Sequence, residues 1–235
     1  MISIIIPVYN EAAGIADLLK HLDERSTSGK ITEILVVDGG STDNTIFRAN
    51  NYINNGSLLP MSVLTSRKGR ASQMNTGAKQ AKGEILYFLH ADSYPPHGFD
   101  TTILNQVEKG NSAGCFRMKF DTKHPVLTFS QWFTRFNVRA CRGGDQSLFI
   151  SRDLFTSLKG FNEDFDVYED CEFIGRIYDE HDFTVVNDYV ITSSRKYTKN
   201  GTLRLQYHFT VIHFKKWFGA SPSELTRYYN KYIVS

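Results

Sequence analysis

The sequence has few cysteines, no closely spaced cysteine pair and no long apolar run. Its 235 residues include only Cys115, Cys141 and Cys171, so neither a structural zinc site nor a redox dithiol is predicted, and a reducing cytoplasm fits better than secretion. No stretch approaches the roughly 20 apolar residues that a membrane-spanning helix requires. The charged fraction of 22% and the net charge of +2 exclude a disordered chain and give no reason to expect nucleic acid as a partner.

Two common nucleotide-binding signatures are also missing. GxGxxG does not follow the first apolar run, and GxxxxGK[ST] occurs nowhere in the chain, so neither a dinucleotide fingerprint nor a P-loop is expected. The phosphates of any bound nucleotide would need another source of positive charge. A divalent cation held by one carboxylate and the diphosphate oxygens is the usual solution, and Asp92 is the candidate carboxylate.

Apolar runs and helical patterns alternate in the first half of the chain. Helices are expected at 11–24, 42–54 and 70–82, the second capped by Ser41. Short runs rich in β-branched residues predict buried strands at 2–8, 31–37, 61–64 and 84–89. This alternation predicts an α/β fold with a mostly parallel sheet and helices on both faces.

The second half is less regular. It is expected to contain strands at 112–120, 147–150, 184–186 and 189–192, and helices near 125–140, at 169–181, at 201–218 and from 222. Ser221-Pro222-Ser223-Glu224 is a strong helix start signal. One α/β domain followed by a helical tail is the expected organisation.

Polar clusters directly follow three of the predicted strands. They are Pro7-Val-Tyr9-Asn10-Glu11, Asp38-Gly-Gly-Ser41-Thr-Asp43 and His90-Ala-Asp92. In an open parallel sheet, ligands bind beyond the carboxyl ends of the strands. Each cluster alone is more typical of a turn or a helix cap, but their common position predicts a binding site.

Five motifs together resemble glycosyltransferase family 2. They are Ile4-Ile-Ile-Pro7-Val-Tyr-Asn-Glu11, Val36-Val-Asp38-Gly-Gly-Ser41-Thr-Asp43, Gly69-Arg-Ala-Ser-Gln-Met-Asn75-Thr-Gly77, His90-Ala-Asp92 and Tyr168-Glu-Asp170. The resemblance covers roughly residues 1–180. Gly143-Gly-Asp145-Gln146 and the aromatic tail are most similar to a small subgroup associated with radical-SAM or selenium-related gene clusters.

The resemblance implies a GT-A fold over residues 1–200, with a nucleotide-binding half (1–110), an acceptor half (111–200) and a separate amphipathic basic tail (201–235). It also implies binding of a nucleotide sugar, with a UDP-sugar favoured because Asp38 would accept a hydrogen bond from uracil N3–H. Asp92 would hold Mn²⁺ or Mg²⁺ against the diphosphate. The other nucleotide-binding residues implied are Pro7, Tyr9, Glu11, Arg67, Arg70 and Asn75.

The same resemblance assigns the chemistry to Asp170, which would act as the general base for an unidentified acceptor hydroxyl. Glu169 would lie near the acceptor, and Arg195 would neutralise the leaving diphosphate. Asp145 follows a double glycine, and this flexible turn either brings its carboxylate to the acceptor or is only a hairpin connection. With one base and no second carboxylate nucleophile assigned, the transfer is expected to invert the anomeric carbon. Nine Asp or Glu residues and one Arg lie between 163 and 182, and this excess of like charge is expected to raise some carboxylate pKa values.

The chain departs from the family pattern at His90, where the D-x-D motif has its first aspartate. The loss of one carboxylate weakens the prediction of a metal. It also keeps open a non-catalytic nucleotide-binding scaffold as an alternative function. A sugar-phosphate nucleotidyltransferase is the other alternative, although 7–11 lacks the glycine-rich basic loop which that class of enzyme requires.

The end of the chain is strongly basic. Residues 195–235 contain eight Lys or Arg and one acidic residue, Glu224. On a helix from 202, Leu203, Tyr207, Val211, Phe214 and Phe218 would form one apolar stripe. Two interpretations stay open: a peripheral contact with the inner face of a membrane, or packing on the domain or in a homodimer.

Overall fold

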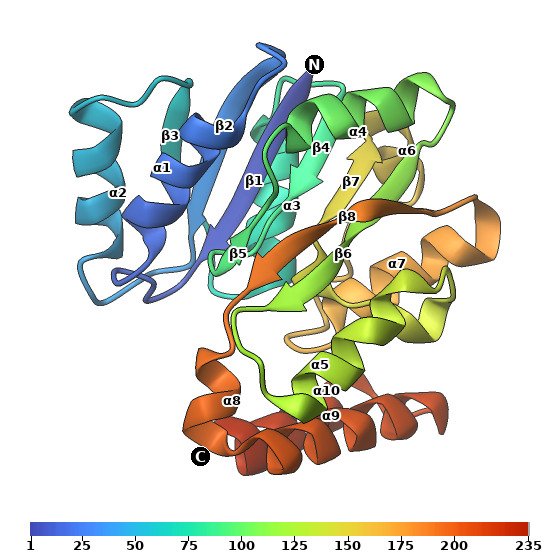
Figure 1. The fold of residues 1–235 in the computed structure, drawn as a ribbon. Coiled ribbons are helices and arrows are strands. Elements are labelled where there is room, and N and C mark those ends of the chain that lie inside the picture. The colour runs from blue at the N-terminus through green and yellow to red at the C-terminus, as the bar shows by residue number, and fades with distance from the viewer. Residues whose placement is uncertain (235) are drawn as a thin grey trace.

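The apolar runs lie side by side in one mixed sheet of eight strands, in the order β3-β2-β1-β4-β7-β6-β8-β5 (Figure 1). The structure, a computed structural model, describes residues 1–234. The strands are β1 (Ile2–Val8), β2 (Ile31–Asp38), β3 (Met61–Thr65), β4 (Ile85–Phe88), β5 (Ser93–Tyr94), β6 (Ala113–Phe120), β7 (Leu148–Ser151) and β8 (Thr184–Thr192).

The directions of the strands decide which loops meet. β3, β2, β1 and β4 run parallel to one another, and β6 runs parallel to β8. β7 lies between β4 and β6 and is antiparallel to both. The amino end of β7 therefore reaches the edge at which β1, β2, β4, β6 and β8 end. The predicted α/β fold with a mostly parallel sheet is confirmed.

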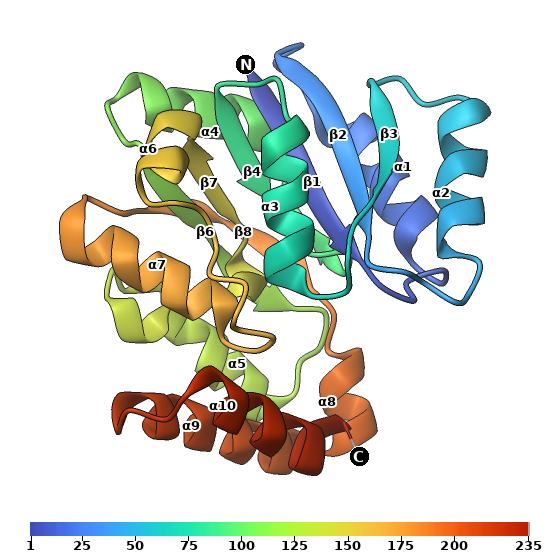
Figure 2. The same cartoon turned by 180° about the vertical axis from the view of Figure 1, so that it is seen from behind.

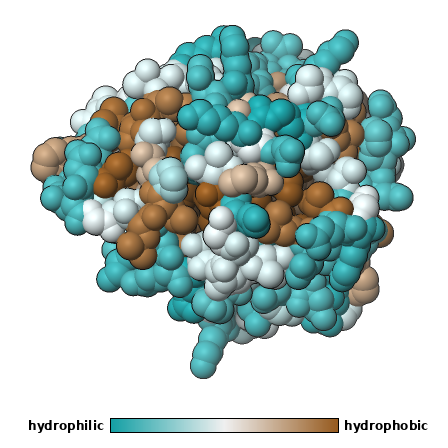
Figure 3. Space-filling model, turned by 90° about the horizontal axis from the view of Figure 1, so that it is seen from above, coloured by the Kyte–Doolittle hydropathy of each residue, from teal (hydrophilic) through white to brown (hydrophobic). Residues whose placement is uncertain are grey.

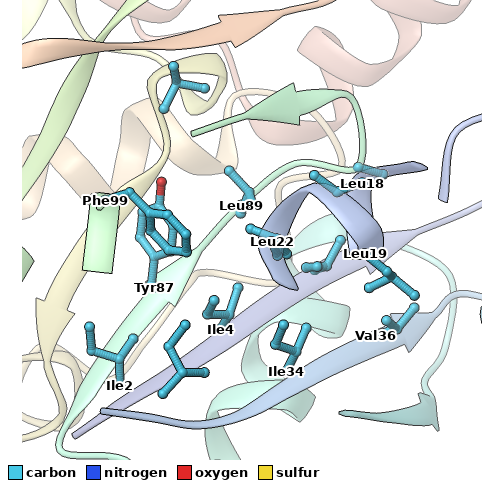
Figure 4. Packing of buried hydrophobic residues seen from close by; sticks show 14 of the residues in the cluster. Ile2, Ile4, Leu18, Leu19, Leu22, Ile34, Val36, Tyr87, Leu89 and Phe99 are labelled. Atoms are coloured by element: carbon cyan, nitrogen blue, oxygen red, sulfur yellow. The ribbon is translucent and has the colours of Figure 1, made fainter. Parts of the chain in front are cut away.

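Helices cover both faces of the sheet. Side chains along a strand point to the two faces in turn, and here both faces are apolar. Ile4 and Ile6 pack against one face, under α1 (Ile15–Arg25), α2 (Thr45–Asn54) and α4 (Phe99–Glu108). Figure 4 shows Leu18, Leu19 and Leu22 of α1 in this layer, with Tyr87 and Phe99 beside them. Ile5 belongs to the other layer, which contains α3 (Arg70–Gln80), α6 (Arg152–Ser157) and α7 (Glu169–Glu180) (Figure 2).

The remaining helices lie beyond the carboxyl edge of the sheet (Figure 1). They are α5 (Pro125–Trp132), α8 (Arg195–Asn200), α9 (Thr202–Trp217) and α10 (Pro222–Tyr229), followed by a π-helical turn at Asn230–Val234. A third apolar cluster joins Phe120 of β6 and Leu127 of α5 to Leu205, Ile212 and Leu225. The helical tail therefore packs on the domain. None of the helices in the described part of the chain is long and apolar enough to cross a membrane.

The surface at the other end of the molecule, where the parallel strands begin, has a different distribution of hydrophobic residues. Viewed from the amino ends of the parallel strands, the surface carries a band of hydrophobic residues bordered by hydrophilic ones (Figure 3). The polar clusters predicted from the sequence follow the carboxyl ends of β1, β2 and β4, on the far side of the sheet from this view.

Two of the expected helix starts were wrong. The helix expected at 42 begins at Thr45, because the Ser41 hydroxyl accepts a hydrogen bond from the Asn10 amide (2.8 Å) and does not cap the helix. The helix expected at 11 begins at Ile15, after a turn closed by the Glu11 carbonyl. The start signal at Ser221 is confirmed as a complete capping box.

The pattern at 125–140 also gives a shorter helix than expected, since α5 ends at Trp132 and single 3₁₀ turns follow. The two short strands expected after Thr184 are one strand, β8, whose register against β6 shifts between Phe116 and Arg117.

A buried carboxylate fastens α4 to the loop before β2. Asp100 accepts hydrogen bonds from the amides of Thr27 (3.0 Å) and Ser28 (2.7 Å) and from the Ser28 hydroxyl (2.6 Å). Burial alone would raise the pKa of Asp100, but the hydrogen bonds from Ser28 and Thr27 outweigh it and hold the pKa below its ordinary value.

We expect Asp100→Asn to lower the free energy of unfolding by about 2 kcal/mol at neutral pH, because the amides of Thr27 and Ser28 lose charged acceptors. Since the folded pKa of Asp100 is depressed, its contribution is complete above the ordinary carboxyl pKa and is lost as the pH falls through the folded value. Urea titrations at about pH 7 and about pH 3 measure the difference. The exposed Asp182→Asn is the control, and equal losses at both pH values would contradict the assignment.

Candidate active site

A cavity of about 470 Å³ lies at the carboxyl edge, between the sheet and the C-terminal helices. Its walls come from segments far apart in the chain. The end of β1, the loops after β1 and β4, the start of α3, the loop before β7 and the start of α7 contribute Pro7, Tyr9, Glu11, Arg70, His90, Asp92, Gly144, Asp145, Glu169 and Asp170. The C-terminal helices contribute Lys196, Tyr197, Gln206, Phe209, Ile212, His213 and Tyr229.

The loops after β1 and β2 are held together by their own polar groups. Asn10 has a positive φ of 56°, which asparagine tolerates better than most residues. Its side-chain oxygen accepts a hydrogen bond from the Thr42 amide, while the Thr45 hydroxyl accepts one from the Glu11 amide, both at 2.8 Å. The buried Gln73 amide donates to the carbonyls of Val8 and Val37, both at 2.7 Å. This side of the cavity is therefore preorganised.

Charged groups meet at the centre of the cavity around His90. Nδ1 of His90 lies 3.4 Å from Oδ1 of Asp145, and Nε2 lies 3.3 Å from Oδ2 of Asp170. Because both ring nitrogens face carboxylates, the geometry favours the doubly protonated imidazolium. Burial alone would lower the pKa of His90, but the two carboxylates outweigh it and raise the pKa to about 10.

The pKa values of the carboxylates around His90 shift in different directions. Burial alone would raise the pKa values of Asp145 and Asp170, yet His90 and Arg70 outweigh it and hold both below their ordinary value. Glu169 is fully buried, and burial raises its pKa although Nε of Arg70 lies 2.6 Å from Oε1. Neither oxygen of Glu169 makes an aligned hydrogen bond. The expected rise in carboxylate pKa is found at Glu169, where burial is the largest cause and the charge of Asp170 adds to it. The expectation is wrong for Asp170.

Gly144, the glycine directly before Asp145, has a steric role. A Cβ atom on Gly144 would collide with Oδ2 of Asp170 and would lie 2.5 Å from Cε1 of His90, whereas one on Gly143 would meet nothing within 4 Å. The sequence suggested a flexible turn or a hairpin connection at this position. The structure instead shows that Gly144 lets the backbone approach the charged groups closely.

Backbone strain is concentrated around the cavity. Four residues other than glycine have positive φ in the described part of the chain, and three of them, Asn10, Ser147 and Tyr168, lie in or beside loops that line it. Tyr168 (φ 78°) directly precedes Glu169 and Asp170, and the centre of its ring lies 5.1 Å from the centre of the His213 ring. Strain of this kind typically accumulates at functional sites.

Asp92 is suited to a cation that a ligand helps to hold. Burial, together with the negative charge of Asp145, raises the pKa of Asp92, so a positive charge beside it would be stabilising. No group of three His, Cys, Asp or Glu residues within 1–234 is arranged as a metal site. A cation at Asp92 would be completed by ligand and water oxygens, as is common for Mg²⁺. The residues present fit that arrangement.

Four predicted site residues lie off the cavity wall. Asp38 is 1% exposed, with Oδ2 accepting from the amides of Gly40 and Ser41 and Oδ1 unpartnered. Arg67 pairs with Glu163, and Asn75 holds the backbone of Phe161. Arg195 pairs with Glu11 at 3.0 Å, at the rim. Of the three aspartates assigned to one site, Asp92 and Asp170 line the cavity and Asp38 does not. The binding role of Asp38 stays a prediction.

The sequence did not predict the wall formed by the C-terminal helices. Lys196, which lines the cavity, donates to the Tyr229 hydroxyl at 2.7 Å and lies over the rings of Tyr229 and Phe209. The only signal was the mixture of basic and aromatic residues in the tail. Lys68, also not predicted, lies 4.1 Å from the centre of the Tyr9 ring.

Comparison with known proteins gives consistent results. The family model "Glycosyl transferase family 2" matches residues 3–166. Glycosyltransferase AglE of Haloferax volcanii is 36% identical over 94 residues, which are 40% of this chain and 31% of that protein. This chain therefore spans only part of the length of that relative.

Two solved structures share the fold. A Staphylococcus aureus TarS fragment in complex with UDP-GlcNAc has a TM-score of 0.68 and 22% identity, and the match covers 82% of this chain and 58% of that one. The mannosyltransferase PcManGT of Pyrobaculum calidifontis, in complex with GDP-Man and Mn²⁺, has a TM-score of 0.70 and 22% identity, with coverage of 99% and 68%.

We expect Gly144→Ala to destabilise the protein by about 1–3 kcal/mol, because the added methyl group must displace Asp170 or His90. Gly143→Ala adds the same group one residue earlier, into open space, and is the matched control. Chemical denaturation of both variants gives the comparison. Similar stability for the two variants would show that the close approach at Gly144 is not required.

We expect the His90 imidazole to stay protonated at neutral pH and to titrate near pH 10. Because the folded pKa is raised, the stability that protonation adds is complete below the ordinary histidine pKa of about 6.5 and is lost as the pH rises toward the folded value. NMR titration of the His90 Cε1–H signal in chelator-containing buffer, with His90→Gln for assignment, measures it. A midpoint near the ordinary value would disprove the paired imidazolium.

Proposed function

The chain belongs to glycosyl transferase family 2, and on that premise we propose that it is an inverting transferase which moves a sugar from a nucleoside-diphosphate donor to an acceptor hydroxyl. The observation that carries the proposal is the arrangement of Asp92 and Asp170. They come from the carboxyl end of β4 and the start of α7, and both line one cavity. One is suited to a cation beside a diphosphate, and the other to the acceptor.

The donor is assigned to the wall made by the loops after β1 and β4. Pro7, Tyr9 and Glu11 line this wall, and the polar contacts behind it fix its shape. The fold neighbours bind UDP-GlcNAc in one case and GDP-Man with Mn²⁺ in the other. We propose a UDP-sugar with Mn²⁺ or Mg²⁺ for this chain, the cation held by Asp92. When bound, the cation supplies positive charge to the departing diphosphate.

The protein's own cations contribute further charge. Lys196 lies on the cavity wall, and Arg195 at the rim is close enough to Asp92 for each to shift the pKa of the other. We assign both to the diphosphate side. Arg70 remains beside Glu169 and keeps that buried carboxylate paired.

The general base is assigned to Asp170. Since His90 and Arg70 hold its pKa low, Asp170 is ionised at neutral pH and can accept a proton. The acceptor oxygen forms a bond to the anomeric carbon while the bond from that carbon to the diphosphate oxygen breaks. The hydroxyl proton passes to Asp170, and the nucleoside diphosphate leaves. A single displacement of this kind inverts the anomeric centre.

Two finer assignments rest on the sequence. The relation to the radical-SAM- or selenium-associated subgroup rests on Gly143–Gln146 and the aromatic tail. A location in the reducing cytoplasm, or at the inner face of its membrane, rests on the unpaired cysteines and on the basic tail.

We expect Asp170→Asn to lower nucleoside-diphosphate release by about 10²–10⁴-fold, because the acceptor loses its base, while donor binding is retained. The measurement is UDP release from UDP-sugars and GDP release from GDP-sugars, with Mn²⁺ and with chelator, together with thermal-shift binding of each donor. Glu180→Gln, an exposed change on the same helix, is the control.

Undiminished release by Asp170→Asn would remove the assignment of the base. A wild-type protein that binds donors but releases no diphosphate under any condition would instead favour the non-catalytic scaffold. The anomeric configuration of the product, determined by NMR, tests inversion separately.

A further inference from the structure

Helix α9 has two apolar faces, and only one of them is covered. Leu205 and Ile212 are buried against α5 and α10 in the third apolar cluster. The other face carries large side chains that are between 51% and 81% exposed. At 100° per residue these side chains project within a sector of about 100°, on the side of the helix opposite Leu205 and Ile212. We call them the outer stripe: Leu203, Tyr207, Phe214, Trp217 and Phe218.

A second exposed aromatic cluster lies on the neighbouring helix. Phe129, Trp132, Phe133 and Phe136, on α5 and the turn after it, are between 39% and 67% exposed and contact one another edge to face or tilted. α5 packs beside α9 at the same end of the molecule (Figures 1 and 2). Among the described residues, 9 of the 16 exposed large hydrophobic side chains belong to these two groups, more than scattered exposure would give.

The two segments that carry these side chains have charges of almost one sign. No Asp or Glu occurs between Thr122 and Gly144, and Glu224 is the one acidic residue after Arg195. The Glu224 side chain is taken up by the cap of α10, where it accepts from the Ser221 amide at 2.8 Å. Arg204, Lys215 and Arg227 are exposed on α9 and α10. A partner for this surface must therefore be apolar and negatively charged.

From this combination we infer that α5 and α9 dock the protein on the surface of an anionic lipid bilayer. Exposed Trp, Tyr and Phe on a helix with Lys and Arg beside them are typical of helices that lie in the membrane interface. Anionic lipid headgroups also attract basic residues near the surface by about 1 kcal/mol each. A second copy of the chain would bring two basic surfaces together, so charge disfavours a homodimer here.

Docking would place the candidate active site beside the bilayer. α9 lines the cavity with Gln206, Phe209 and His213 while its outer stripe faces away from the protein. The same helix would thus touch lipid on one side and the cavity on another. The docking itself depends only on the surface, and it is testable without any transferase activity.

The experiment is co-sedimentation of the full chain with vesicles, in the absence of nucleotide. One set contains phosphatidylcholine with about one third phosphatidylglycerol, and the other contains phosphatidylcholine alone. We expect sedimentation with the anionic vesicles only, weakened by added salt. The double variant Trp217→Ser/Phe218→Ser should bind them about tenfold or more weakly, since two large apolar groups no longer enter the interface.

The matched control is Phe47→Ser/Leu58→Ser, which removes two side chains that are 69% and 80% exposed elsewhere on the molecule. Circular dichroism confirms that each variant is folded. Docking is overturned if wild type binds neither vesicle, or if the control variant loses as much binding as the α9 variant. It is also overturned if light scattering shows a wild-type dimer that the α9 substitutions dissociate.

Discussion

The candidate active site depends on the imidazole of His90, which lies between the carboxylates of Asp145 and Asp170. Placing the buried carboxylate of Asp170 close to the half-exposed carboxylate of Asp145 is unfavourable unless a cation lies between them. The raised pKa of His90 supplies that cation at neutral pH. The family pattern has an aspartate at position 90, but a third carboxylate beside Asp145 and Asp170 would repel both. The histidine and Asp145 are therefore two parts of one arrangement.

The reversed strand β7 makes this arrangement possible. In a fully parallel sheet, only the segments that follow strands reach the carboxyl edge. Because β7 runs the other way, the segment that precedes it also arrives there and brings Asp145 to His90. Gly144 then lets this segment approach without steric conflict. The direction of β7, the missing side chain at Gly144 and the ion pair between His90 and Asp145 together form this part of the site.

The sequence predicted the features that depend on local pattern. Apolar runs predicted the central strands. The polar clusters Pro7–Glu11 and His90–Asp92 predicted the place of the site, because a parallel sheet brings the ends of its strands together. Features that depend on contacts across the fold were not predicted. Asp145 lies far from His90 in the chain, so their pairing leaves no local signal. Asn75 lies in the Gly69–Gly77 motif and Arg67 lies just before it, but the contacts that engage them, with Phe161 and Glu163, come from a distant loop.

The buried amide of Gln73 limits how substrates can reach the site. It donates one hydrogen bond to the end of β1 and one to the end of β2. Together with the contacts of Asn10 and Glu11, it keeps the loops that follow from moving apart independently. The opposite rim is made by the C-terminal helices, which within residues 1–234 pack on the domain through the side chains of the third apolar cluster. If product escape requires the cavity to open, α8 to α10 are therefore the elements that would move.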